Sequence, residues 1–543
     1  MKLREIIAIT ESGSSAAGIE FVVTNPSTDE FSFTASNCAT TPQRIERVRI
    51  TTDLVVERFV ESGWQSWSTV RPTTPGDARP ERSDAPRWFR HQMLADGAAA
   101  GLALSADTML LHEGGVLGSL DLAGPPVTFR IEADGSVFID VLLDGIILEP
   151  GETRDLASIA TLEGDPSALY SGWAETSGVR AGRRPSRPAP LGWCSWYQYF
   201  TEVTANDIRT NTALAAQHGL ELIQIDDGWQ ASIGEWGSTN ERFGTPIEVL
   251  AAEIQDAGMS AGIWTAPFLA IEGGPLATTR PEWLVTNEAG TPRTAMVHGL
   301  WGGRVFALDT SRLDVQDHLI ATYRNLRNLG FTYFKIDFLH AGAVPGSRAT
   351  SGTATRFDAL RQGLEAIRTG IGDDAYLLGC GCPLGAGVGI VDAMRVSEDV
   401  APHWEPGAHF AGWPESSVGT MNAVEQSIRR SPLHRRWFSN DPDCALLRPV
   451  ETTLTSQQRR VLAETVTGTG GFTMVSDDLS TYSPVEWDIL AAMDQQRTLV
   501  DTPLELIDPL SKTSLSVAGE NHHLSVDLVT PTSSLSVTPS KDH

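Results

Sequence analysis

The sequence predicts a multidomain chain with a central (β/α)8 TIM barrel over residues 183–492, an N-terminal β-sandwich over 1–182 and a small C-terminal antiparallel β domain over 493–543. Three observations support this prediction. The first part alternates apolar and polar residues, the second repeats short apolar runs followed by segments of helical period, and alternation returns near the C-terminus. An Arg- and Pro-rich segment at 180–190 separates the first two parts, because it can continue neither a strand nor a helix.

The N-terminal part is expected to be β throughout, with no long helical pattern before Ser167. Segments 48–60 and 127–148 alternate with a period of two, which is typical of strands with one buried face. The step Asp134-Gly135 lies inside the second segment and predicts a hairpin turn. Two packed sheets are the natural way to bury such faces, so the prediction is a sandwich.

The central part contains eight apolar runs that alternate with helical segments over about 300 residues, which is the size of a (β/α)8 barrel. A doubly wound sheet is the alternative, but its Gly-rich phosphate loop after the first strand is missing from this sequence. The predicted strands are 192–196, 222–226, 260–265, 333–338, 376–382, 393–397, 437–440 and 471–476, and the candidate helices include 205–217, 247–255, 311–329, 356–368, 418–430 and 457–466.

Composition narrows the possible partners. The 543 residues carry 41 basic and 68 acidic side chains, a net charge of −27, which argues against nucleic acid and anionic membranes as partners. No run of about 18 apolar residues predicts a membrane span, and the N-terminus lacks a secretory apolar region. Five cysteines without zinc-ligand spacing predict neither a disulfide framework nor a metal site. We therefore expect a cytoplasmic protein that acts on a neutral small molecule.

Acidic residues follow several predicted barrel strands, at the end where TIM-barrel enzymes place their active sites. Asp226 and Asp227 end the second strand, Asp337 lies on the fourth and Asp399 follows the sixth. Helix capping by Asp is the structural alternative, and it explains any single residue. It explains the whole ring poorly, because gathered carboxylates repel one another.

Lys335 and Asp337 are expected to project from the same face of the fourth strand, because they are two positions apart. Lysine is rare in this chain, which uses arginine for most basic positions. A structural ion pair is the alternative, although arginine makes the better fork to a carboxylate. Cleavage of a glycosidic bond needs two facing carboxyl groups, and Asp337 and Asp399 are the candidates. Glu398 competes with Asp399 but points to the other face of its strand.

Tryptophan is the second feature typical of a sugar site, since the apolar face of a sugar packs on an aromatic ring. The chain has 15 Trp against 7 Tyr. The alternative for each is core packing, and Trp193 and Trp196 cannot both point inward from a regular strand. The tryptophans that flank the acidic residues are Trp193, Trp196, Trp229, Trp264 and Trp404.

Several motifs together resemble glycoside hydrolase family 36, the melibiase-like α-galactosidases. They stand in the family's order and cover the predicted barrel, whereas the N-terminal part carries only one of them. The motifs are LGWCSWYQYF (191–200), IDDGWQ (225–230), FKIDF (334–338), GCGCPLG (379–385), RVSEDVAPHW (395–404), NDPD (440–443) and, in the N-terminal part, GWQSWS (63–68).

The resemblance implies the three-part architecture and retaining hydrolysis of terminal α-galactosides of the melibiose or raffinose type, without metal or organic cofactor. It implies that Asp337 is the nucleophile and Asp399 the acid/base. It also implies that Asp226 and Asp227 bind the 4- and 6-hydroxyls of the sugar. Cys382 with Gly385 is expected near the 2-hydroxyl. The remaining expected substrate-binding residues are Trp264, Arg304, Lys335, Trp196, Arg395 and Trp64.

A retaining mechanism requires the two carboxyl groups to lie about 5–5.5 Å apart. Three alternatives stay open: a raffinose-synthase-like galactosyltransferase, a hydrolase for α-N-acetylgalactosaminides or α-glucosides, and a sugar-binding protein without catalysis.

The GWQSWS segment is either a Trp-rich core turn or a loop that leans over the barrel mouth. The sequence leaves the oligomeric state open.

Overall fold

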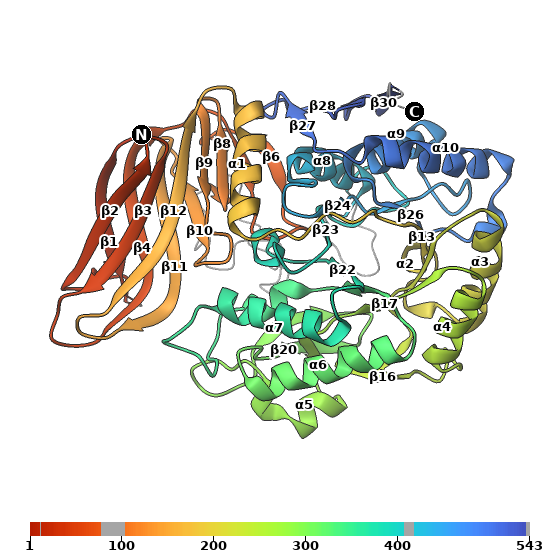
Figure 1. The fold of residues 1–543 in the computed structure, drawn as a ribbon, viewed down its shortest axis with the longest axis horizontal. Coiled ribbons are helices and arrows are strands. Elements are labelled where there is room, and N and C mark those ends of the chain that lie inside the picture. The colour runs from red at the N-terminus through yellow and green to blue at the C-terminus, as the bar shows by residue number, and fades with distance from the viewer. Residues whose placement is uncertain (11, 78–103, 407–417, 539–543) are drawn as a thin grey trace.

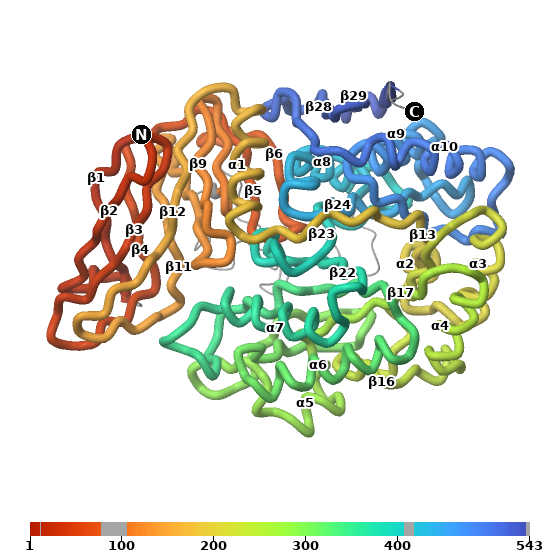
Figure 2. The backbone as a smooth tube through the Cα atoms, viewed as in Figure 1, coloured from red at the N-terminus to blue at the C-terminus, as the bar shows by residue number. Residues whose placement is uncertain are grey.

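The computed structural model describes residues 1–543 except 11, 78–103, 407–417 and 539–543. The N-terminal strands stand to one side of a central α/β body, and the C-terminal strands lie along one edge of that body over α8 and α9 (Figures 1 and 2). None of the described helices is both long and apolar enough to cross a lipid bilayer.

The N-terminal part is one hydrogen-bonded sheet of twelve strands, in the order β1-β4-β11-β10-β7-β5-β8-β9-β12-β3-β2 with β6 paired to β5. Ile50 of β4 and Ile159 of β12, from distant places in this order, belong to one buried cluster, so the sheet encloses its own core. The division of these strands into the two sheets of a sandwich stays a prediction. The strands are β1 (Leu3–Ile9), β2 (Ile19–Ser27), β3 (Glu30–Asn37), β4 (Gln43–Val55), β5 (Phe59–Ser62), β6 (Val70–Thr73), β7 (Leu104–Asp107), β8 (Met109–His112), β9 (Gly115–Ser119), β10 (Val127–Ile131), β11 (Ser136–Leu148) and β12 (Thr153–Glu163).

The hairpin predicted at Asp134-Gly135 is confirmed. β10 and β11 pair antiparallel around it, and Gly135 has a φ of 85°, which a residue with a side chain rarely adopts. The Oδ1 of Asp134 accepts a hydrogen bond from the backbone N–H of Ser136 at 3.0 Å. Local turn chemistry therefore sets this register.

Helix α1 (Pro166–Arg180) joins the N-terminal sheet to the barrel. Trp173 donates from its indole N–H to the carbonyl of Ser119 on β9, and Trp437 near β24 donates to the carbonyl of Ala174. Residues 183–190 after it form neither helix nor strand, as their composition predicts.

The barrel sheet is parallel throughout and has the order β24-β23-β22-β21-β17-β14-β13-β26-β25. Its two end strands are consecutive in the chain and only Pro442 and Asp443 lie between them, so the sheet is nearly closed. Each predicted strand overlaps an observed one, and the seventh is split into two short strands. They are β13 (Leu191–Cys194), β14 (Leu222–Ile225), β17 (Ser260–Thr265), β21 (Tyr333–Ile336), β22 (Tyr376–Gly379), β23 (Ala393–Arg395), β24 (Ser439–Asp441), β25 (Cys444–Ala445) and β26 (Thr473–Val475).

The helices follow the predicted alternation with one departure. Between β22 and β23 the described chain forms only the 3-10 turn η6 (Leu384–Gly387), so the exact (β/α)8 alternation is not reproduced. The side chains of Thr204, Thr355, Thr455 and Ser483 cap four of the helices reciprocally, which explains where these begin. The α-helices are α2 (Trp196–Tyr199), α3 (Ala205–Gln217), α4 (Ile247–Asp256), α5 (Pro275–Thr279), α6 (Leu313–Asn328), α7 (Arg356–Ile371), α8 (Thr420–Arg429), α9 (Ser456–Gly470) and α10 (Pro484–Val500), and the other 3-10 turns are η3 (Phe200–Glu202), η4 (Pro281–Trp283), η5 (Leu339–Ala343), η7 (Ser431–Leu433) and η8 (Leu479–Thr481).

Two small sheets are inserted after the second and third barrel strands. One pairs β15 (Gln230–Ser232) with β16 (Glu235–Thr239), and the other has the order β18-β20-β19. The strands of the second are β18 (Leu269–Ile271), β19 (Thr294–His298) and β20 (Gly303–Ala307).

The C-terminal part is a four-stranded antiparallel sheet of β27 (Glu505–Ile507), β28 (Ser514–Ala518), β29 (His522–Asp527) and β30 (Thr532–Val537). Its buried Leu524 belongs to the same apolar cluster as the barrel. Helix α10 crosses the expected boundary at 492/493, and the sheet itself begins at Glu505.

Candidate active site

Buried polar side chains gather at the carboxyl ends of the barrel strands. Asp226 and Asp227 follow β14, Asp337 follows β21, and Asp399 lies four residues beyond β23. Asp441 ends β24. All but Asp399 are less than a tenth exposed, and the side chain of Asp399 is 30% exposed. This is the end of the barrel at which the sequence predicts the site.

Lys335 pairs with Asp226, from the strand next but one. Its Nζ lies 2.9 Å from Oδ2 of Asp226, and Gln224 donates to the same oxygen at 2.5 Å. Burial is the largest single influence on the pKa of Lys335 and lowers it, but Asp226 and the other acidic neighbours together outweigh burial, so the net pKa lies well above its ordinary value. The ion pair considered as a structural alternative thus exists, but its salt-bridge partner is Asp226 and not Asp337.

Asp337 is held by two N–H donors. Trp264 donates from Nε1 to Oδ2 at 3.0 Å, and the backbone N–H of Phe338 donates to Oδ1 at 2.7 Å. The ring of Trp264 is fixed in turn, since its carbonyl accepts from Nε1 of Trp229 at 3.0 Å. Phe338 has a φ of 54°, in the left-handed region that a bulky residue adopts at a cost of about 1–3 kcal/mol. Strained backbone of this kind concentrates at functional sites.

The side chain of Asp227 accepts hydrogen bonds from two neutral donors. It accepts from Nε2 of Gln230 at 2.6 Å and from Nε1 of Trp301 at 2.8 Å. Burial, reinforced by the charges of Asp226 and Asp337, raises its pKa to about 7. An open pocket of about 400 Å³ borders Asp227 and Trp301. The sequence analysis assigned no role to Trp301 or Gln230.

Arg395 contacts three carboxyl groups at once. Its Nη1 lies 3.1 Å from Oδ1 of Asp399, its Nε 3.1 Å from Oδ2 of Asp441, and its Nη2 2.8 Å from Oδ1 of Asp443. Tyr197 donates its hydroxyl to Oδ2 of Asp443. Asp441, Asp443 and Tyr197 all lie in motifs noted from the sequence, and the same-face spacing of the two Asp at a strand end was the signal that could have identified them.

Asp399 differs from Asp337 in its surroundings. Burial raises the pKa of Asp399, and the charges of Arg395 and Lys335 partly oppose that rise. The charge of Asp337 raises the pKa of Asp399 further. The two carboxyl groups therefore interact, and Asp399 is the one whose surroundings favour a bound proton.

The GWQSWS loop, residues 63–68, leans on the barrel mouth. The backbone N–H of Ser66 donates to the carbonyl of Cys382 at 3.1 Å, and the ring of Trp67 lies edge-on to Phe338 with 5.0 Å between centroids. Arg430 donates to the carbonyls of Ser66, Ser68 and Val396 at 2.5, 2.9 and 2.7 Å. The loop is buried and also contacts the barrel mouth, so features of both predicted alternatives, the core turn and the loop at the mouth, are present.

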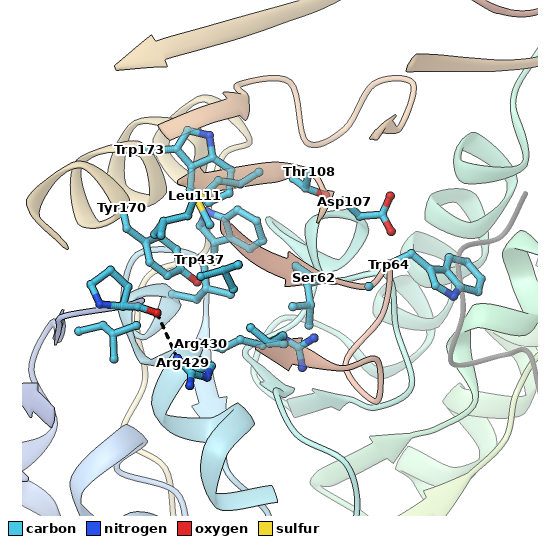
Figure 3. Close-up of a pocket in the computed structure, with 18 residues that line it drawn as sticks. Ser62, Trp64, Asp107, Thr108, Leu111, Tyr170, Trp173, Arg429, Arg430 and Trp437 are labelled. Carbon is cyan, nitrogen blue, oxygen red and sulfur yellow. Dashed lines mark hydrogen bonds between the residues drawn. The ribbon is translucent and has the colours of Figure 1, made fainter. Parts of the chain in front are cut away.

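Trp64 itself is buried in the interface. Its ring packs edge-on to His340 at 6.1 Å and near Phe357 at 6.4 Å. It also lines a cavity of about 50 Å³ between the N-terminal strands, α1 and α8, where Figure 3 shows it on the side opposite Trp173 and Tyr170. Trp67 of this loop reaches Phe338, the residue next to Asp337.

The other predicted residues have different partners in the described structure. Trp196 is half-buried and packs on Phe200, and Arg304 is exposed and paired with Glu272 on β18–β20. Cys382 is fully buried with its thiol directed at the carbonyl of Pro383. Gly385 faces Leu122 of the N-terminal part. The residues that the structure joins into one network are Asp226, Asp227, Trp264, Lys335, Asp337, Arg395 and Asp399.

Comparison with known proteins finds a melibiase family model and several α-galactosidases that are similar to parts of this chain. A sequence model of the melibiase family matches residues 179–365. The α-galactosidase AgaA of Geobacillus stearothermophilus is 24% identical over 296 residues, which are 48% of this chain and 40% of that protein. The match with α-galactosidase 2 of Pediococcus pentosaceus, at 28% identity, covers 26% of this chain and 20% of that protein. The chain thus spans less than half the length of the curated relatives it matches.

Solved structures match over nearly the whole chain. The α-galactosidase TtGalA of Thermus thermophilus, solved with p-nitrophenyl α-D-galactopyranoside, is 26% identical with a TM-score of 0.73, covering 94% of this chain and 99% of that chain. The structure of AgaA has a TM-score of 0.63 at 13% identity, covering 97% and 81%, and shows the shared fold. Residues 179–365 are therefore similar to the melibiase family, and the chain as a whole has the fold of the α-galactosidases of glycoside hydrolase family 36.

Proposed function

We propose that the chain is a retaining, exo-acting α-galactosidase that works by double displacement. The observation that carries the proposal is the contrast between two carboxyl groups at the barrel mouth. Asp337 accepts one N–H on each oxygen, as a carboxylate does, whereas burial and like charge favour a proton on the partly exposed Asp399. A retaining glycosidase needs this pair of protonation states before its first step.

In the proposed mechanism, Asp337 attacks the anomeric carbon and Asp399 gives its proton to the leaving oxygen. The glycosidic bond breaks as an ester between Asp337 and galactose forms. Asp399, now a carboxylate, then removes a proton from water, which displaces Asp337 and restores both groups. The indole N–H of Trp264 holds the attacking carboxylate in a fixed direction.

The proposed substrates are terminal α-galactosides of oligosaccharides of the melibiose or raffinose type. Structures of the Thermus thermophilus relative with p-nitrophenyl α-D-galactopyranoside and with stachyose support this substrate class. Asp226 and Asp227 bind the 4- and 6-hydroxyls in this proposal. The other proposed sugar-binding residues are Trp264, Lys335, Arg395, Cys382, Gly385, Arg304, Trp196 and Trp64. Five free thiols are consistent with the proposed cytoplasmic location.

The test is hydrolysis of nitrophenyl α-galactoside by the wild-type chain and by Asp337→Asn, with the anomer of the released sugar followed by NMR. Release of α-galactose, lost in the variant, is the expected result. The α-N-acetylgalactosaminide and α-glucoside analogues, and an added acceptor sugar, separate the competing activities. Initial release of the β anomer would contradict the retaining mechanism.

The role of Asp399 is tested with two leaving groups. Asp399→Asn should slow an alkyl α-galactoside far more than the nitrophenyl compound, because nitrophenolate leaves without protonation. Equal losses for the two substrates would contradict the acid role of Asp399.

A further inference from the structure

Arg395 is shared among more carboxyl groups than it can neutralise. It carries one positive charge and contacts Asp399, Asp441 and Asp443. The guanidinium and the side chains of Asp441 and Asp443 are at most 3% exposed, so water screens this group poorly. With all three carboxyl groups ionised, the cluster would hold two negative charges in excess. A proton on one of the three relieves that excess.

Of the three carboxyl groups, Asp443 accepts the most hydrogen bonds from described residues, since four donors converge on it. Its Oδ1 accepts from the backbone N–H of Cys444 at 2.7 Å and from Nη2 of Arg395 at 2.8 Å. Its Oδ2 accepts from the backbone N–H of Val400 at 2.9 Å and from the hydroxyl of Tyr197. Hydrogen bonds to the charged form favour ionisation and oppose the effect of burial, so Asp443 carries its negative charge beside Asp399 at pH values above its pKa.

Asp399 accepts fewer hydrogen bonds than Asp443 from the described residues. Among the described residues it forms one ion pair, with Nη1 of Arg395, and the nearby hydroxyl of Tyr197 is directed at Asp443 instead. Val400, whose N–H binds Asp443, is the residue directly after Asp399. Asp443 is therefore linked to Asp399 through a side-chain cation, a shared hydroxyl and the adjacent backbone.

We propose that Asp443 is a positioning residue that keeps the proton of the acid/base on Asp399, because its carboxylate neutralises Arg395 and takes the Tyr197 hydroxyl. This inference rests on the proposed function, since it concerns the acid of the proposed reaction. Burial opposes the charge of Asp443 and raises its pKa to about 6, so the effect is strongest above that pH. The charged and titratable groups that face Asp399 or Asp443 are Arg395 on β23, Lys335 and Asp337 at β21, Tyr197 on α2, Cys380 after β22, and Asp441 and Cys444 on β24 and β25.

The test is the pH dependence of kcat/KM for an alkyl α-galactoside, whose basic limb reports loss of the proton from the acid. Asp443→Asn removes one negative charge from the surroundings of Asp399, so this limb should move down by about one pH unit. Tyr197→Phe removes a donor to the carboxylate of Asp443 without changing the net charge, so Asp443 takes up a proton more readily and the limb should also move down, by less than in Asp443→Asn. General loosening of the barrel would also expose Asp399, so a control at a remote buried carboxylate is needed.

Asp392→Asn is the matched control. Asp392 is also buried and paired with arginines, Arg368 and Arg184, but it precedes β23 at the opposite end of the strand from Asp399. This variant should lose stability and leave the basic limb in place. A folded Asp443→Asn whose limb stays at the wild-type pH overturns the proposal. If Asp443→Asn does not fold, a limb that is unmoved or raised in Tyr197→Phe overturns it.

Inactivity of the wild-type chain on every galactoside would reject the proposed function and not this inference. The protonation of Asp399 is then followed directly, from the carboxylic acid band in infrared difference spectra between wild type and Asp399→Asn. Loss of that band at lower pH in the Asp443→Asn background supports the role of Asp443. Loss at the same pH overturns it.

Discussion

The Nζ of Lys335 lies 2.9 Å from Oδ2 of Asp226, so the interior lysine of β21 pairs with a carboxylate from β14 across the intervening strand β17. Asp337, two positions along the same strand, is held by Trp264 and its own chain neighbour instead. The lysine thus stabilises Asp226, the first of the two aspartates that follow β14, and it interacts with Asp337 and Asp399 through its charge.

Replacing Lys335 with Met should destabilise the chain by about 3–5 kcal/mol, because it leaves the carboxylate of Asp226 buried without its cation. Both side chains are at most 5% exposed, so solvent screens the pair little. The measurement is urea unfolding at pH 7. The double variant Lys335→Met/Asp226→Leu should recover part of the loss, whereas additive losses would mean that the two residues act independently.

Replacing Trp264 with Phe should lower kcat on nitrophenyl α-galactoside by about tenfold or more. The change removes the Nε1 donor to Asp337 and keeps a ring in place, and a hydrogen bond to a charged group contributes about 1.5–3 kcal/mol. Trp236→Phe is the control, since Trp236 packs edge-on to Trp264 at 5.9 Å and leaves the donor of Trp264 intact. Equal effects of the two variants would assign the loss to packing.

Asp227 should make the chain less stable as the pH rises from about 4 to about 7. Its pKa in the folded chain is about 7, above the usual value, so the folded chain binds more protons than the unfolded chain within that window. Relative to wild type, Asp227→Asn should gain up to about 1.4 kcal/mol of stability per pH unit across this range and stay level above it. Unfolding is measured at several pH values, with the exposed Asp256→Asn as control. A difference that does not change with pH would refute the assignment.

Replacing Arg430 with Met should cost about 3 kcal/mol or more and reduce activity together with stability. The buried guanidinium binds backbone carbonyls of Ser66, Ser68 and Val396, which lose their donor in the variant. These contacts hold the GWQSWS loop against the barrel mouth, where Trp67 meets Phe338. The exposed pair Arg209–Glu253 supplies the control, and Arg209→Met should cost less than about 1 kcal/mol. Thermal unfolding and kcat/KM are measured on the same preparations.

Local patterns were enough to predict much of this fold. The positions of the barrel strands follow from runs of apolar residues, because a parallel strand is covered on both faces and carries few polar residues. The start of α3 follows from Thr204 and Asp207, whose reciprocal capping needs only neighbours in the chain. The turn at Gly135 is local in the same way.

The partners of the charged side chains came from the tertiary structure alone. Lys335 could be placed on the inner face of its strand, but the choice of Asp226 over Asp337 depends on how β14 and β21 lie across β17. Arg395 gathers carboxyl groups from residues up to 48 positions away in the chain, at Asp443. Periodicity is a property of a single segment, whereas an ion pair or a shared proton depends on distances between segments. The sequence by itself therefore determined the order of the strands, the acidic residues at their ends and the family resemblance. The closure of the barrel decided which of those acidic residues lie close enough to share a cation or a proton.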